Sequence, residues 1–238
     1  ALSCKNSMGQ PLTIQQAFLL TTLVWVALPL FGALPFMLGE TDLDFIDAFF
    51  EAMSGVTTTG STVIAGLDAL PKGLLLWRGI LQWLGGLGIV IVALVFLPEM
   101  RVGGMQFFRA EGFDTFGKAL PRTIDISKGV LNVYLGLTAI CTLTFLALGM
   151  GAFDATVHAL TTVSTGGFSS MDSSFAAFPG GPQYACVVFM ILASLPFVRM
   201  MQGVQGNILP LYRDTQVRTY LRWIFYSVAL VVGYDFIM

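Results

Sequence analysis

FIDAFFEAMSGVTTTGST, residues Phe45 to Thr62, is a short amphipathic helical pattern that runs into serine, threonine and glycine. About ten helical residues would extend only about 15 Å, too short to cross a hydrocarbon core of about 30 Å. Glycine after such a helix admits positive φ and close backbone approach. The pattern therefore predicts a re-entrant helix and loop, which must be buried in protein or line a cavity.

A second copy of this pattern, FDATVHALTTVSTGGF, occupies residues Phe153 to Phe168. The two copies align without a gap at a constant offset of 107 residues. Identical residues meet at Asp47 and Asp154, Ala48 and Ala155, Ala52 and Ala159, Thr58 and Thr165, and Gly60 and Gly167. A gapless repeat in matching surroundings predicts two copies of one structural unit.

The composition is that of a membrane protein. Apolar residues make up 55% of the chain and charged residues 11%, and the mean hydropathy is +0.79, whereas about a quarter of the residues of an average soluble domain are charged. A net charge of −2 provides no basic patch, so no nucleic-acid partner is expected. The cysteines Cys4, Cys141 and Cys186 are far apart and lack metal-ligand spacing, which argues against a disulfide framework or a zinc site.

Charge-free apolar runs surround both copies and predict an all-α integral membrane protein. The runs are Ala17 to Leu38, Gly79 to Leu97, Gly129 to Phe153 and Pro182 to Val198. The order helix, re-entrant helix with loop, helix therefore occurs twice. We expect a first unit over residues 1–110, a second over 111–210, and the truncated start of a third over 211–238, where Trp223 to Tyr234 is again apolar.

Glycines in the second apolar run, Leu84 to Gly88, resemble a nucleotide-binding loop only superficially. No strand precedes them, and G-x-G-x-x-G is absent. They predict close helix packing instead. Trp77 and Arg78, which directly precede this run, are expected at a membrane interface.

The distribution of basic residues orients the chain in the membrane. Nine of the twelve Lys and Arg residues lie in Glu99 to Lys128 and in Arg199 to Arg222, and the positive-inside rule places these connections in the cytoplasm. The Ser/Thr/Gly loops then enter from outside, beside acidic residues such as Asp68 and Asp172.

Ionisable residues follow the helical period within the two re-entrant segments. Asp47 and Glu51, and likewise Asp154 and His158, are four residues apart and share a helix face. Ionisable groups at membrane depth are functional candidates. Asp47 and Asp154 are instead interpreted as stabilising the helix N-termini, and His158 as a satisfied packing residue, whereas Glu51 remains a candidate.

Four stretches together resemble the TrkH family, the membrane subunits of bacterial Trk potassium uptake systems in the wider Trk/Ktr/HKT group. They are GVTTTGST, RGILQWLGGLGI, GGMQFFRAE and FDATVHALTTVSTGGFSS. The resemblance implies four fused channel-like units around one pore, each giving a filter segment with a key glycine. By this resemblance we expect two complete units and the start of a third in the given sequence, without the N-terminal helix pair seen in many members.

Carried over by position, the resemblance implies two potassium-binding filter segments supported by the pore-helix residues Asp47, Glu51 and Asp154. The first segment consists of Thr57, Thr58, Thr59 and Gly60, and the second of Ser164, Thr165, Gly166 and Gly167. The resemblance also implies potassium uptake across the bacterial inner membrane, a homodimer, and a cytosolic nucleotide-binding regulatory subunit of the TrkA type. Potassium is the transported ion, and no cofactor is expected in the chain.

Two other classes of function are weighed against an ion-conducting subunit. A sodium- or proton-coupled secondary transporter typically shows charged groups within spanning segments and an inverted repeat, whereas the basic connections give both units the same orientation. An intramembrane hydrolase would have to pair His158 with Ser164 or Ser54. Neither G-x-S-x-G nor a third orienting group accompanies that pairing.

Overall fold

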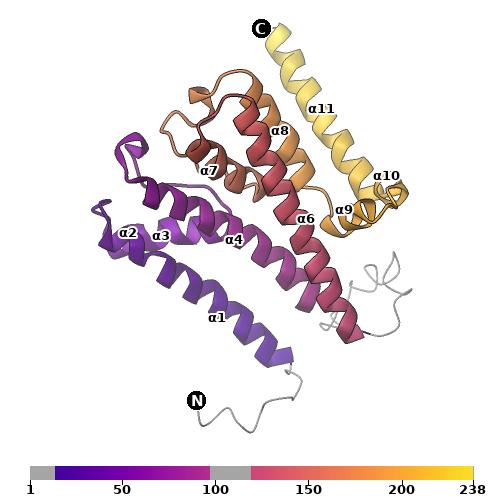
Figure 1. The fold of residues 1–238 in the computed structure, drawn as a ribbon, viewed down its shortest axis with the longest axis horizontal. Coiled ribbons are helices and arrows are strands. Elements are labelled where there is room, and N and C mark those ends of the chain that lie inside the picture. Colours follow the sequence, from indigo (N-terminus) through magenta and orange to yellow (C-terminus); the bar gives the residue numbers. More distant parts are fainter. Residues whose placement is uncertain (1–13, 97–118, 238) are drawn as a thin grey trace.

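The structure is a computed structural model that describes residues 14–96 and 119–237, and these ranges contain helices and loops but no strand (Figure 1). The α-helices are α1 (Ile14–Gly32), α2 (Leu34–Leu38), α3 (Phe45–Val56), α4 (Lys72–Phe96), α6 (Ala119–Ala147), α7 (Ala152–Val163), α8 (Gly181–Ala193), α9 (Phe197–Val204), α10 (Leu209–Arg213) and α11 (Thr215–Ile237). Short 3-10 helices, η1 (Leu67–Ala69) and η3 (Ser174–Ala177), lie in the loops. The predicted all-α class is confirmed.

Two helical stretches in the described ranges are long and apolar enough to cross a membrane, Phe18–Leu38 and Ile126–Ala147. The first joins α1 and α2 across a break at Ala33, with Pro29 inside α1 and Pro35 in the first turn of α2. The N–H of Ala33 still donates to the carbonyl of Pro29 at 2.8 Å. The first predicted span is therefore one apolar stretch with a break near its prolines.

Helix α4 lies between the two short helices and packs against both α3 and α7 (Figure 1). It is 25 residues long, and the side chains beyond residue 88 lie outside the described ones. A Cβ on Gly85 would lie 1.9 Å from the carbonyl oxygen of Val56 at the end of α3, and one on Gly86 would lie 3.0 Å from Cβ of Ser164, which follows α7. The prediction of close helix packing at these glycines is confirmed.

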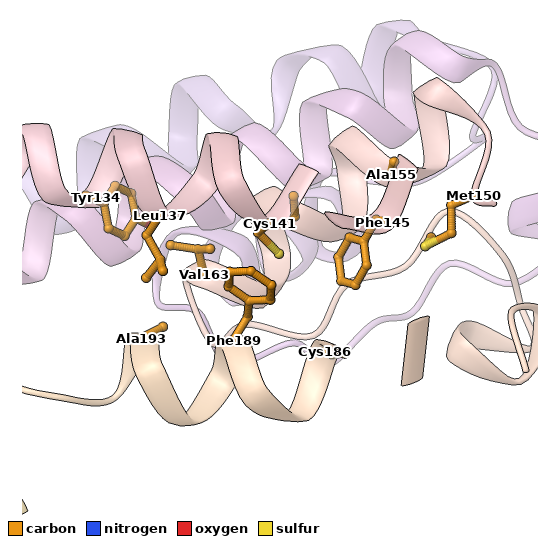
Figure 2. Close-up of a cluster of buried hydrophobic side chains, with 11 residues drawn as sticks. Tyr134, Leu137, Cys141, Phe145, Met150, Ala155, Val163, Cys186, Phe189 and Ala193 are labelled. Atoms are coloured by element: carbon orange, nitrogen blue, oxygen red, sulfur yellow. The ribbon is translucent and has the colours of Figure 1, made fainter. Parts of the chain in front are cut away.

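Each short helix has its own apolar core. Ala48, Ala52 and Val56 of α3 pack with residues of α4, including Leu75 and Leu81. Around α7 the corresponding cluster combines side chains of α6, α7 and α8, and Figure 2 shows Cys141, Phe145, Val163 and Phe189 within it. Burial of these apolar surfaces holds the two short helices in place.

The last apolar run of the second unit, Pro182 to Val198, is not one straight helix. Helix α8 ends at Ala193, and α9 begins at Phe197 after a bend of 97°. Pro196 lies at the bend and disfavours helical backbone at the preceding residue, Leu195. At 13 residues, α8 is about 20 Å long and does not cross the bilayer alone.

The predicted basic connection from Arg199 to Arg222 is largely helical, consisting of α9, α10 and the beginning of α11. Arg199 Nε donates to Asp214 Oδ2 at 2.8 Å, and the Asp214 carboxylate also accepts from the first backbone N–H groups of α11. Burial alone would raise the pKa of Asp214, but these hydrogen bonds hold it below its ordinary value. The predicted boundary at residue 110 lies outside the described residues, and the boundary at 210 falls within α10.

Candidate functional site

The two short helices have the same bounds once the offset of 107 residues is applied, since α3 ends at Val56 and α7 at Val163. The loops that follow share their backbone conformation as well. Thr58 and Thr165 have φ of 55° and 54°, and Gly60 and Gly167 have φ of 80° and 83°. Positive φ is unfavourable for threonine, so the surrounding contacts must hold both loops in this conformation.

Backbone hydrogen bonds at the helix ends also repeat at the same offset. The N–H of Thr59 donates to the carbonyl of Ser54 and the N–H of Gly166 to that of Thr161, both at 2.9 Å. These bonds satisfy carbonyl groups that a helix end otherwise leaves unpaired. Within the described residues, none donates to the carbonyl oxygens from Thr57 to Gly60. Free carbonyl oxygens beyond the negative end of a helix dipole favour a cation.

The two loops touch each other. A Cβ on Gly60 would lie 2.0 Å from the carbonyl oxygen of Gly166, and a Cβ on Gly166 would lie 2.4 Å from the side-chain amide carbon of Gln82. Only glycine allows this approach, so both loops and α4 form one closely packed site.

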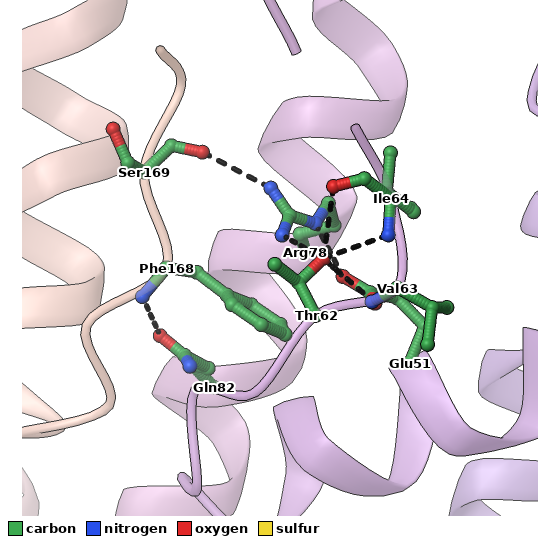
Figure 3. A network of polar contacts seen from close by, with 8 residues as sticks. All are labelled: Glu51, Thr62, Val63, Ile64, Arg78, Gln82, Phe168 and Ser169. Atoms are coloured by element: carbon green, nitrogen blue, oxygen red, sulfur yellow. Dashed lines mark hydrogen bonds and ion pairs between the residues drawn. The ribbon is translucent and has the colours of Figure 1, made fainter. Parts of the chain in front are cut away.

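Glu51 anchors the loop of the first copy (Figure 3). Its side chain is fully buried in α3 and accepts hydrogen bonds from the Thr62 hydroxyl and from the N–H of Val63, at 2.9 to 3.1 Å. Thr62 in turn accepts from the N–H of Ile64 at 3.0 Å. Glu51 therefore ties the helix to the chain just after Gly60.

His158 occupies the same position in the second copy. Its Nε2 lies 3.0 Å from the Ser169 hydroxyl, and its Nδ1 lies 2.9 Å from the carbonyl oxygen of Asp154. Ser169 accepts from the N–H of Met171 at 3.0 Å, as Thr62 accepts from Ile64. The aromatic rings of η3 and its C-terminal neighbour, Phe175 and Phe178, pack edge-on against the imidazole. The prediction of a satisfied packing residue is confirmed.

The pairings considered for a hydrolase are not made. His158 contacts Ser169, whereas the Ser164 hydroxyl donates to the carbonyl of Leu160 at 2.9 Å. The Ser54 hydroxyl is buried and has no hydrogen-bond partner among the described residues. A nucleophile with an oriented base is therefore not assembled from the predicted residues.

Asp47 and Asp154 both lie in the first turn of their helices, as predicted. The capping residue of α3 is nevertheless Asp44, whose carboxylate accepts from the N–H of Asp47 at 2.9 Å. Asp47 itself is exposed. Asp154 accepts from the Ser170 hydroxyl at 2.6 Å and so fastens α7 to its loop.

The sequence predicted Arg78 at a membrane interface, but the structure buries it between the two copies. Its side chain is 1% exposed and pairs with Glu51 at 2.8 Å between Nε and Oε1. A buried charge is stable only when it is paired and hydrogen-bonded. The sequence offered one signal, Glu51, because a carboxylate predicted at membrane depth requires a partner. Arg78 directly precedes the next predicted span, Gly79 to Leu97.

Gln82, one turn after Arg78 on α4, was also missed. It is fully buried, and its Oε1 accepts from the N–H of Phe168 at 3.0 Å. A single glutamine in an apolar helix carries no pattern of its own, so only the packed structure identifies this contact.

These features define a class: membrane proteins in which short re-entrant helices end in glycine-containing loops that can line an ion path. A family model described as TrkH, cation transport protein, matches residues 1–223. The chain belongs to the TrkH family. Together with its apolar spanning stretches, this makes it a multi-pass protein of the bacterial inner membrane.

Individual relatives agree with the family match. The chain is 43% identical over 205 residues to the Trk system potassium uptake protein TrkI of Halomonas elongata, covering 85% of this chain and 42% of the relative. It is 38% identical over 212 residues to the Trk system potassium uptake protein TrkH of Escherichia coli K12, and the match covers 87% of this chain and 44% of the relative. The crystal structure of the potassium transporter TrkH from Vibrio parahaemolyticus superposes with a TM-score of 0.81 at 33% identity, covering 94% of this chain and 46% of that one. The chain thus spans about half the length of these relatives, whose names describe transport.

Proposed function

We propose that the chain forms part of the ion-translocating subunit of a Trk-type potassium uptake system. Backbone oxygens of Thr57 to Gly60 and of Ser164 to Gly167 are two segments of its selectivity filter. The observation that carries this proposal is the repeated loop geometry, with glycine at φ of 80° and 83° in the loop that follows each short helix.

Potassium is the substrate, and its binding needs no cofactor in this mechanism. Carbonyl oxygens replace the hydration shell of the ion, and the C-terminal ends of α3 and α7 add negative potential behind them. Glu51 and Asp154 support the loops from behind, through Thr62 and Ser170. Further units of the full-length protein would contribute the remaining segments, and no enzymatic role is assigned.

A coupled cation transporter is the second candidate, and one observation favours it. The Glu51 and Arg78 side chains form a charged pair inside the apolar part of the protein, and such groups can carry coupling ions or protons. In this structure, however, both side chains are occupied by contacts to the loops. This arrangement supports a filter more directly than a proton path.

The partners belong to the proposal as well. The relatives are named as members of a Trk system, which supports a multi-component assembly. We infer a homodimer and a cytosolic regulatory subunit of the TrkA type, docked on the basic cytoplasmic connections. Of the basic residues in these connections, Arg213 lies in α10, whereas Arg101, Arg109 and Lys118 lie outside the described residues.

The test is ion flux into liposomes that contain the purified full-length protein. Rubidium uptake driven by a potassium gradient is expected, with sodium competing poorly, while protein-free liposomes serve as the control. Single-channel currents would then separate conduction from coupled transport. Liposomes that take up neither rubidium nor potassium would refute the proposal.

A further inference from the structure

The Arg78 side chain donates hydrogen bonds to both loops at once. Its Nε donates to Glu51 at 2.8 Å, its Nη2 to the Thr62 hydroxyl at 3.1 Å, and its Nη1 to the carbonyl oxygen of Ser169 at 3.0 Å. Thr62 lies two residues after Gly60, and Ser169 two residues after Gly167. The guanidinium group thus bridges equivalent points of the two copies (Figure 3).

The second loop is held to α4 by two additional contacts. Cζ of Arg78 lies 4.2 Å from the centre of the Phe168 ring, and Gln82 accepts a hydrogen bond from the N–H of the same residue. The guanidinium plane therefore meets an aromatic face and three hydrogen-bond acceptors simultaneously. A lysine side chain has one nitrogen and no such plane, so it cannot reproduce this set of contacts.

Both members of the pair between Arg78 and Glu51 are buried. Arg78 is 1% exposed and Glu51 is fully buried. Replacing a buried ion pair by apolar residues is often neutral or stabilising, so a pair of this kind is weak evidence for a purely stabilising role. Here its hydrogen bonds end on the chain directly after both glycines, where they fix the distance between the loops.

We propose that Arg78, paired with Glu51, is a positioning residue that sets the spacing of both filter segments, so that its planar guanidinium, beyond its charge, determines potassium selectivity. This inference rests on the proposed function, because it assigns the loops to one filter. The contact between Gly60 and the Gly166 carbonyl transmits any change in spacing from one loop to the other.

The test compares Arg78→Lys with the double variant Glu51→Gln/Arg78→Gln in the full-length protein. Arg78→Lys keeps the positive charge opposite Glu51 but loses the planar guanidinium group with its several N–H donors. We expect the potassium-to-sodium permeability ratio to fall by about tenfold, on the order of one hydrogen bond to a charged group. The double variant removes both charges and is expected to fold and conduct, again with a lowered ratio.

Arg199→Lys is the matched control. Arg199 also pairs with an aspartate through Nε, but it lies away from the loops and is partly exposed. Its variant is expected to keep the wild-type ratio and the wild-type amount of folded protein. A lowered ratio in this control would show that loss of any paired arginine relaxes selectivity, and would overturn the specific role of Arg78.

Thr62→Val provides a second route if Arg78→Lys does not fold. The substitution is close to isosteric and removes only the hydroxyl that joins Arg78 to Glu51, so a smaller fall in the ratio is expected. A wild-type potassium-to-sodium permeability ratio in Arg78→Lys would overturn the inference and leave the proposed function intact. If Arg78→Lys does not fold, a wild-type ratio in Thr62→Val would do the same. A wild-type protein without potassium flux would overturn the proposed function and this inference with it.

Discussion

In the first copy a buried carboxylate, Glu51, anchors the loop, whereas in the second copy the imidazole of His158 does so at the same offset. The backbone of the two loops is nevertheless the same, with matching positive φ values at Thr58 and Thr165. The residues at equivalent positions of the following helices explain why the two anchors differ. Arg78 of α4 reaches both loops, while Ala185 stands at the corresponding position of the later helix.

The comparison distinguishes the loop backbone, which is the same in both copies, from the side chains that support it, which differ. The small residues and the hydrogen bonds at the helix ends determine the conformation of each loop and are repeated. The side chains behind the loops determine how the copies are held together, and these are not repeated, because one helix, α4, packs against both copies. The two copies therefore keep equal loops with unequal supports.

The largest expected effect is on the charged anchor. Glu51→Gln leaves the guanidinium of Arg78 buried without its counter-charge, which should lower the free energy of unfolding by about 3–5 kcal/mol. His158→Gln preserves a polar group near Ser169 and should cost only about 1 kcal/mol. Thermal unfolding of the purified variants measures both. Equal losses would mean that the two anchors do not differ as described.

The next effect distinguishes the two loop glycines. Gly60→Ala forces a side chain onto positive φ, at roughly 1–2 kcal/mol, and into the Gly166 carbonyl, at roughly 1–3 kcal/mol more. Gly167→Ala meets nothing within 4 Å and carries the φ penalty alone. We expect Gly60→Ala to reduce the potassium-to-sodium permeability ratio more than Gly167→Ala. The reverse order would contradict the packing of the loops.

A smaller effect tests the helix that serves both copies. Gly85→Ala would bring a methyl group against the carbonyl of Val56 and should destabilise the protein by roughly 1–3 kcal/mol. Gly88→Ala, one turn nearer the end of α4, meets nothing within 4 Å and should be neutral or stabilising by up to about 1 kcal/mol. Melting temperatures of the two variants give the comparison, and similar values would argue against close packing at Gly85.

The smallest effect is expected at the partly exposed ion pair between Arg199 and Asp214. Asp214→Asn keeps the side-chain acceptor at the start of α11 and removes only the charge, so the loss should stay below about 1 kcal/mol and shrink in high salt. Because the pKa of Asp214 is lowered, its contribution is present above the unfolded pKa and is lost as the pH falls through the folded value. Unfolding at neutral and acidic pH checks this, and a larger loss at acidic pH would contradict it.

The repeat and the apolar runs were sufficient to predict the short helices, because their small residues and hydrophobic periodicity are local properties. The bend between α8 and α9 was missed although Pro196 marked it, since an apolar run alone does not show whether a helix continues. Arg78 was misplaced because its burial depends on a carboxylate 27 positions earlier in the chain. The cap by Asp44 was missed because two acidic residues compete for that turn and only the packed backbone selects one.

We propose that backbone oxygens of both loops coordinate the same permeating ion. Crystals of the full-length protein grown in rubidium would test it directly, through the anomalous signal of the bound ion. We predict rubidium at coordination distance from carbonyl oxygens of Thr57 to Gly60 and of Ser164 to Gly167 together. Rubidium bound elsewhere in the protein, with both loops free of it, would contradict the account.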